Sequence, residues 1–272
     1  GELCELPFEE RQIAGKSIRE SRFQVQKDDA YILMSDGTIY CGMGDIMNYS
    51  WDRDSMAQYA LKCVKTTKSA SRMASLLVDA CNDLYGQVPS DDTTIAVARV
   101  KEEKIVSILT GPPANPKDDG IFVADFMRPE GKKIISGGIT GKLAARELGR
   151  ELVPDNGPLD PEIPPTSVIQ GIDLVTEGVV TLNKVVYMLR EYTSEDVSVE
   201  FFEELDKNNG ASRIARILIE DCTTVQLFVG CGINEAYKDK NMPFDVTARK
   251  SLVEQLAEVL ERMQLRVVVA YY

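Results

Sequence analysis

Apolar residues in the C-terminal part of the chain follow two alternating patterns. Short apolar runs, typical of strands, alternate with longer stretches in which apolar residues recur at helical spacing. Strand-like runs lie at 105–109, 133–135, 172–175, 225–229 and 266–271, helix-like runs at 119–127, 142–150, 212–220 and 248–263, and a further apolar run at 179–192. This repeated order predicts a largely parallel sheet with both faces covered.

Two acidic turns in the first hundred residues are each joined to a short apolar strand. The strand-like run at 30–34 ends in Ser35-Asp36-Gly37, and about 55 residues later Ser90-Asp91-Asp92 leads into a strand-like run at 94–100. Carboxylates held at strand ends suit hard cations such as Mg²⁺ or Mn²⁺. Both sequences are also ordinary turns, so the residues alone leave a purely structural role open.

The arrangement resembles the C-terminal half of the metal-dependent PPM protein phosphatases, in the branch that contains stage II sporulation protein E. In that branch an L-x-S-D-G strand end, here Leu33 to Gly37, is followed by helices and then by a D-D-x-T strand, here starting at Asp91. The segments 55–65 and 70–85 have the helical spacing expected between the two motifs. The resemblance covers roughly residues 15–100.

The resemblance implies a metal site that contains Asp36, Asp91 and Asp92. Asp36 and Asp91 are the implied ligands, and Asp92 takes the place of the polar residue that follows the second ligand. The implied cofactor is Mn²⁺ or Mg²⁺, and the implied substrate is a phosphoprotein of bacterial signalling. In the family a metal-bound water attacks phosphoserine or phosphothreonine, because two cations lower the pKa of the water and clamp the phosphoryl oxygens.

One motif of the family is missing from this sequence. The family has an earlier strand that ends in Asp-Gly-x-Gly, whose aspartate bridges both metals, and nothing before Asp36 supplies it. The segment from Cys41 to Gly44 has a similar outline, but it follows the Ser-Asp-Gly turn and has a cysteine in place of the carboxylate. The chain begins at Gly1 in what reads as mid-domain sequence. We therefore expect a fragment that is inactive alone as a phosphatase, although its parent protein would be active.

Composition and charge argue against several other classes of function. The 272 residues contain no histidine, which excludes Ser-His-Asp and Cys-His hydrolases and histidine-ligated zinc enzymes. The net charge of −12 argues against binding to nucleic acid and to anionic membranes, since both select basic surfaces. Six cysteines without a C-x-x-C pair favour reduced thiols and a cytoplasmic location. No apolar run reaches the roughly 20 residues that span a bilayer.

Four of the predicted C-terminal strands end in small loops that contain glycine. In an open parallel sheet these loops gather at one carboxyl edge, where ligands bind. The loop at 136–140 leads into a helix, whose free amides could bind a phosphate or carboxylate. Glycine after a strand also serves simply to turn the chain, so the residues leave both interpretations open. The candidate ligand-binding residues are Gly111, Ser136, Gly137, Gly138, Thr140, Thr176, Glu177 and Gly230.

The sequence therefore predicts two parts. Residues 1–101 are expected to be half of a PPM-type α+β sandwich, and residues 102–272 a mostly parallel, Rossmann-like α/β domain. The predicted function is that of a metal-dependent serine/threonine phosphatase. The alternative is a non-catalytic sensory or protein-interaction module that binds a small anionic ligand at the glycine-rich edge. An enzyme activity of the second part has only Cys231 as a candidate nucleophile. An unpaired sheet edge in the first part would favour a homodimer.

Overall fold

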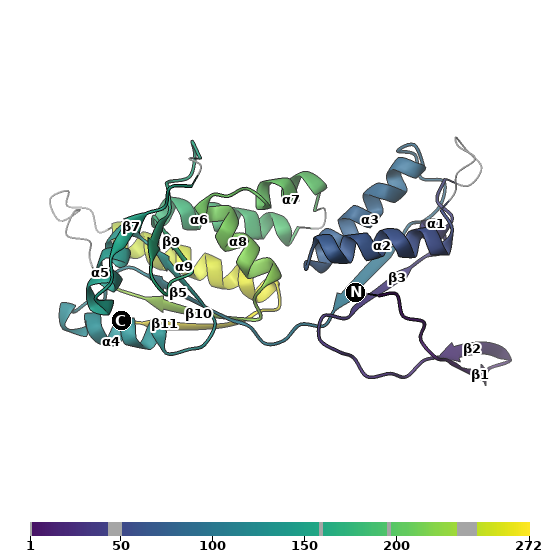
Figure 1. Cartoon of the computed structure of the whole chain (residues 1–272), viewed down its shortest axis with the longest axis horizontal. Helices are drawn as coiled ribbons and strands as arrows, with labels where there is room; N and C mark the ends of the chain where they lie inside the picture. The colour runs from purple at the N-terminus through teal and green to yellow at the C-terminus, as the bar shows by residue number, and fades with distance from the viewer. Residues whose placement is uncertain (1, 43–50, 158–159, 195–196, 233–243) are drawn as a thin grey trace. The chain divides into compact units, whose positions relative to one another are not determined.

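The computed structural model describes residues 2–42, 51–157, 160–194, 197–232 and 244–272 (Figure 1). The chain divides into two compact units, unit 1 from Gly1 to Glu102 and unit 2 from Glu103 to Tyr272. Each unit has a hydrophobic core of its own. The two units are therefore described separately.

Unit 1 contains two antiparallel strand pairs and two long helices. Strands β1 and β2 form an exposed hairpin, and strands β3 and β4 form a second pair next to the helices. The elements are β1 (Glu9–Ile13), β2 (Lys16–Glu20), β3 (Ala30–Met34), α1 (Asp36–Ile39), α2 (Arg53–Thr66), α3 (Ala70–Leu84) and β4 (Ile95–Arg99).

Local capping and apolar spacing explain the two long helices. The side chain of Asp52 accepts the amide of Ser55 at the start of α2, and that of Ser69 accepts the amide of Arg72 at the start of α3; this is the usual N-cap arrangement. The apolar stripes of both helices form a core with one face of the β3–β4 pair. The buried residues of this core are Cys41, Met56, Ala60, Cys63, Met73, Leu77, Cys81 and Tyr85.

Unit 2 is built on a seven-stranded sheet in the order β11-β10-β5-β6-β9-β8-β7. The strands β11, β10, β5, β6 and β9 are parallel, while β8 is antiparallel to both of its neighbours. The strands are β5 (Ile105–Thr110), β6 (Lys132–Ser136), β7 (Leu152–Pro154), β8 (Ser167–Ile169), β9 (Leu174–Thr176), β10 (Thr224–Val229) and β11 (Arg266–Tyr271). The predicted mixed α/β fold with a mostly parallel sheet is confirmed.

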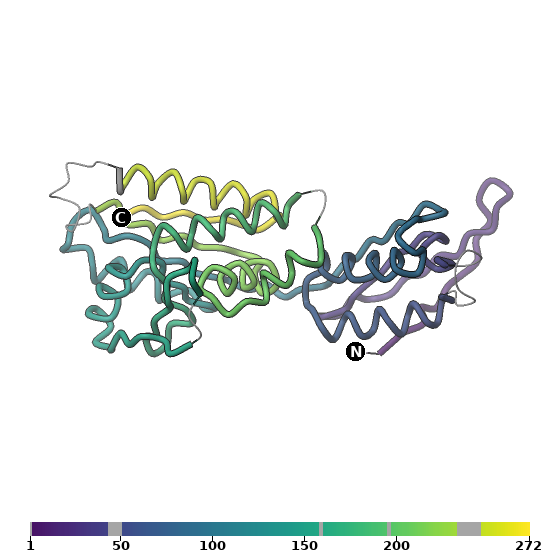
Figure 2. Tube along the Cα trace, turned by 90° about the horizontal axis from the view of Figure 1, so that it is seen from above, coloured from purple at the N-terminus to yellow at the C-terminus, as the bar shows by residue number. Residues whose placement is uncertain are grey.

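Helices cover both faces of this sheet. Side chains alternate along a strand, so Ile108 of β5 packs into the core with α6, α8 and α9, while Leu109 packs into the core with α4 and α5. The long α9 runs alongside β11 (Figure 2). The helices are η1 (Pro116–Asp118), α4 (Asp119–Met127), α5 (Gly138–Leu148), α6 (Val179–Tyr192), α7 (Val199–Leu205), α8 (Gly210–Glu220) and α9 (Phe244–Arg262).

Several boundaries differ from the sequence-based expectation. The helix predicted from residue 142 begins at Gly138, within a glycine-containing segment of low helix propensity. Asp36, predicted in a turn, is the first residue of the short helix α1. Among the described residues, no helix is both long enough and apolar enough to cross a membrane.

Candidate functional sites

The structure brings the two acidic turns of unit 1 together. The Ser35 hydroxyl accepts the amide of Thr94 at 2.9 Å and donates to the carbonyl oxygen of Asp92 at 3.0 Å. The Ser35 amide also donates to the carbonyl oxygen of Thr94 at 3.0 Å. These bonds extend the β3–β4 ladder beyond its last pair, Met34 and Ile95. Ser35 therefore clamps two turns that are far apart in the sequence.

Gly37 allows this close approach. A Cβ added at Gly37 would lie 2.5 Å from the carbonyl oxygen of Asp92 and 3.4 Å from the Cβ of Asp91. The first distance is shorter than real Cβ atoms show, so a larger residue would push the turns apart. Behind the turn, the buried Tyr85 hydroxyl donates to the carbonyl oxygen of Gly37 at 2.7 Å. Gly37 is thus held between helix α3 and the second acidic turn.

The carboxylates of the two turns are exposed. Oδ1 of Asp36 accepts the amide of Gly37 at 3.1 Å, and Oδ1 of Asp91 accepts the amide of Asp92 at 2.8 Å. Asp92 is exposed as well, and its carbonyl oxygen rather than its side chain makes the clamp with Ser35. Exposed oxygen ligands on fixed backbone fit a hard cation such as Mg²⁺ or Mn²⁺.

The number of ligands is smaller than a complete metal site needs. Among the described residues, no three acidic or cysteine side chains gather closely enough to hold a metal ion. The residues present therefore fit Mg²⁺ or Mn²⁺ in chemical type but not in number. The metal role of Asp36, Asp91 and Asp92 stays a prediction.

Three cysteines of unit 1 belong to its hydrophobic core. Cys41, Cys63 and Cys81 are free and buried. Burial raises the pKa of the Cys81 thiol to about 12, and the neighbouring Cys41 adds to this shift. A thiol with such a pKa stays protonated at neutral pH and is a poor nucleophile or metal ligand.

The comparison with known families concerns this unit. Residues 12–101 match the family model of stage II sporulation protein E (SpoIIE). The SpoIIE match covers about one third of the 272 residues and includes both acidic turns. No curated protein and no solved structure matches the chain. Similarity to SpoIIE is therefore a property of unit 1, and unit 2 lies outside the matched segment.

The Ser35 clamp in the SpoIIE-like segment leads to a prediction. We expect Ser35→Ala to lower the free energy of unfolding of unit 1 by about 1 kcal/mol, because two hydrogen bonds between the turns are lost. The only tryptophan, Trp51, packs against the core of unit 1, so its fluorescence during urea unfolding reports this unit. Ser17→Ala, in the exposed strand β2, is the control and should change little. Equal effects of the two variants would contradict the clamp.

The four glycine-bearing loops of unit 2 lie at one edge of the sheet. Thr110 at the end of β5 is paired with Ser136 of β6 on one side and Val229 of β10 on the other. Ser136 is paired in turn with Thr176 of β9. The loops that follow these four strands therefore start in one row. The chain passes from β5 to β6 and β9 in one direction and from β10 to β11 in the other, which places the switch point between β5 and β10.

The loops after β5 and β10 are packed against each other. A Cβ at Gly230 would lie 2.0 Å from the carbonyl oxygen of Pro112. The guanidinium of Arg249, a residue of α9 that is 8% exposed, donates to the carbonyl oxygens of Gly230 and Gly232 at 3.0 and 3.1 Å. A Cβ at Gly111 would meet the same guanidinium at 2.6 Å. Gly111 and Gly230 thus lie in a close backbone contact, and their role as ligand-binding residues stays a prediction.

The last residue, Tyr272, ties this contact to helix α4. Its carbonyl oxygen accepts the amides of Ala114 and Cys231, and its hydroxyl donates to Asp125 at 2.8 Å. Burial, followed by the bond to Asp125, raises the pKa of Tyr272 to about 12. The tyrosine stabilises unit 2 in its protonated form.

This raised pKa predicts a loss of stability in alkali. Because the folded-state pKa lies above the ordinary 10.0, the contribution of Tyr272 is complete below pH 10.0 and is lost as the pH rises through about 12. Urea unfolding followed by circular dichroism should show that the stability difference between wild type and Tyr272→Phe shrinks over this range. A difference independent of pH would contradict the assignment.

The loops after β6 and β9 bring six of the predicted ligand-binding residues together. The amide of Gly137 donates to the carbonyl oxygen of Thr176 at 2.8 Å, and the Ser136 hydroxyl donates to that of Glu177 at 3.3 Å. A Cβ at Gly138 would lie 2.9 Å from Oε1 of Glu177, and one at Gly137 would lie 3.0 Å from Oγ1 of Thr140. These six residues lie together at this part of the edge, and their role in binding a ligand stays a prediction.

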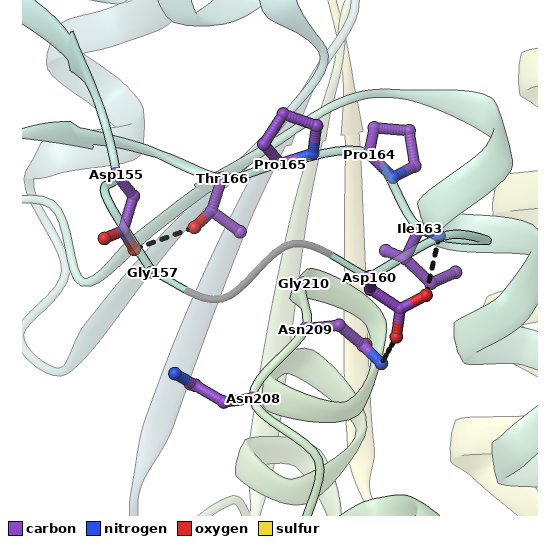
Figure 3. A pocket seen from close by; sticks show the side chains of 10 residues that line it. All are labelled: Asp155, Gly157, Asp160, Ile163, Pro164, Pro165, Thr166, Asn208, Asn209 and Gly210. Atoms are coloured by element: carbon purple, nitrogen blue, oxygen red, sulfur yellow. Dashed lines mark hydrogen bonds between the residues drawn. The ribbon is translucent and has the colours of Figure 1, made fainter.

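A pocket next to this edge is not indicated by the sequence pattern (Figure 3). It lies where the loop between β7 and β8 meets the start of α8. Its carboxylates are engaged within the protein: Asp155 accepts the Thr166 hydroxyl at 2.8 Å and Arg213 at 3.2 Å, and Asp160 accepts Asn209 at 2.9 Å. These bonds fasten the loop to α8. The lining residues are Asp155, Gly157, Asp160, Ile163, Pro164, Pro165, Thr166, Asn208, Asn209 and Gly210.

Proposed function

We propose that residues 12–101 are part of a metal-dependent serine/threonine protein phosphatase in which Asp36 and Asp91 bind the metal. The observation that carries this proposal is the clamp of Ser35, which holds two exposed acidic turns side by side. The match of the same residues to SpoIIE supports it. The proposed substrate is a protein that carries phosphoserine or phosphothreonine.

The chain's own contribution is a pair of oxygen ligands on fixed backbone. Cations in such a site lower the pKa of a bound water and clamp phosphoryl oxygens. Asp36 and Asp91 contribute carboxylates, and Asp92 contributes the backbone that positions the second turn. The described residues supply fewer than three gathered ligands, so we place the remaining carboxylate outside them. We therefore expect weak cation binding by this chain and no phosphate release.

Calorimetric titration with Mn²⁺ tests this proposal. We expect saturable heat from the wild-type chain and its loss in the double variant Asp36→Asn, Asp91→Asn. A second double variant, Asp28→Asn with Glu102→Gln, makes the same change in charge next to the opposite end of the β3–β4 pair. It should bind like wild type. Equal binding by all three proteins would contradict the proposal, because it would place the cation elsewhere.

Phosphate release from a phosphothreonine peptide is measured in the same samples. The absence of turnover agrees with an incomplete set of ligands. Mn²⁺-dependent turnover that is lost in Asp36→Asn, Asp91→Asn would support the phosphatase function and would show that our claim of a missing ligand is wrong.

A further inference from the structure

Two helices of unit 2 begin next to each other at the carboxyl edge of the sheet. Helix α5 follows β6 and helix α6 follows β9, and a Cβ at Gly178 would lie 3.6 Å from the Cα of Gly137. Neither helix has a side-chain cap: the N-cap residues are Gly137 and Gly178. The first amides of both helices therefore lack the usual side-chain partner, and their dipoles favour negative charge at the same place.

A carboxylate of the chain already lies at this place. The oxygens of Glu177 lie 2.9 and 3.0 Å from where a Cβ of Gly138 would be. Gly138 is the first residue of α5, so its bare Cα lets an oxyanion approach the helix N-terminus. Glu177 is exposed and can leave when another anion takes its position.

A buried hydroxyl without a partner provides independent evidence for a ligand. Thr181, in the first turn of α6, is completely buried, and within the described part of the chain its Oγ1 has no hydrogen-bond partner. Side chains of a helix tilt toward its N-terminus, so the Thr181 side chain leans toward the start of α6. Buried hydroxyls are normally hydrogen-bonded, and an unsatisfied one points to a missing partner.

Three exposed apolar side chains lie in the first turns of the two helices. Ile139 of α5 is 41% exposed, and Val179 and Val180 of α6 are 41% and 57% exposed. Small-molecule sites typically combine apolar walls with a few convergent polar groups. We propose that the paired N-termini of α5 and α6 bind the phosphate or carboxylate group of a small molecule with an apolar body, in exchange for the Glu177 carboxylate.

Titration followed by amide NMR of the full chain tests this proposal. The probes are inorganic phosphate and butyrate, each compared with chloride at equal ionic strength. Whichever of the two anions binds identifies the anionic group as a phosphate or a carboxylate. We expect saturable shifts of the amides of Gly138, Ile139 and Val180. Glu177→Gln should strengthen binding roughly threefold, because a competing carboxylate is removed from the helix terminus. Glu254→Gln, in an exposed position of α9, makes the same change in charge and should bind like wild type.

A second pair of variants separates ligand binding from folding. Thr181→Val keeps the shape of the side chain, so we expect it to raise the melting temperature of the ligand-free protein while weakening anion binding about threefold or more. Thr193→Val, at the other end of α6, should not weaken binding. The proposal is overturned if neither anion shifts these amides in wild type and Glu177→Gln, or if Thr181→Val binds as tightly as wild type.

Discussion

Gly230→Ala should lower the free energy of unfolding of unit 2 by about 3 kcal/mol, since one methyl group would be forced into closely packed backbone. The added Cβ would lie 2.0 Å from the carbonyl oxygen and 2.2 Å from the carbonyl carbon of Pro112. Backbone atoms cannot turn away as the end of a side chain can. The clash would separate the loops after β5 and β10 and disturb the bonds of Arg249 to Gly230 and Gly232.

Urea unfolding followed by two signals measures this effect. Circular dichroism reports both units, while the fluorescence of Trp51 reports unit 1. We expect the transition of unit 2 to move to lower urea and the Trp51 transition to stay unchanged. Gly120→Ala, in helix α4, is the control. The added Cβ would face only a side-chain oxygen of Glu147, at 3.5 Å. That variant should be neutral or slightly stabilising. A stable Gly230→Ala protein would show that the contact is not tightly packed.

Gly37→Ala should disrupt the acidic site without removing a carboxylate. The new Cβ would lie 2.5 Å from the carbonyl oxygen of Asp92, so the turns must separate. We expect a loss of about 1–3 kcal/mol in the stability of unit 1, measured by Trp51 fluorescence, together with weaker Mn²⁺ binding in the calorimeter.

Gly15→Ala is the matched control for this prediction. Gly15 lies in the turn of the β1–β2 hairpin, and no atom lies within 4 Å of its added Cβ. Its positive φ of 78° makes alanine unfavourable there too, but the strain falls on the exposed hairpin rather than on the core that contains Trp51. Mn²⁺ binding and the Trp51 transition should be unchanged. If Gly37→Ala also leaves Mn²⁺ binding unchanged, the spacing of the two turns does not matter for the cation.

The alternation of strands and helices in unit 2 could be predicted because each element carries its own apolar period. The closing strand β11 and helix α9 are the clearest cases, with buried residues such as Leu256 and Leu260 at helical spacing. The row of loops after β5, β6, β9 and β10 follows directly from parallel strands. This part of the fold depends on local patterns, which the sequence displays.

Contacts between distant segments could not be predicted in this way. The close packing of Gly111 and Gly230 depends on Arg249, which comes from helix α9. The three-residue strands β7 and β8 are too short to show a period. They join the sheet through pairing with strands that are already there, β8 with β9 and β7 with β8, rather than through their own composition.

The candidate sites also combine residue types that the sequence shows with contacts that only the fold creates. Residue types indicated that Asp36 and Asp91 are suited to a cation, but the clamp of Ser35 and the space left by Gly37 emerge only from the pairing of β3 with β4. In unit 2 the sequence indicated the loop from Ser136 to Thr140 as an anion site. It did not indicate that Glu177 lies at that helix terminus or that Thr181 is buried without a partner.

Whether the two acidic turns form one cation site can be measured by the paramagnetic broadening of amide NMR signals by Mn²⁺. We expect trace Mn²⁺ to broaden first the signals of Gly37, Asp92 and Thr94 and to spare those of the β1–β2 hairpin. This pattern should disappear in Asp36→Asn, Asp91→Asn. Broadening centred elsewhere, or equal broadening in the double variant, would show that the two turns do not form the cation site.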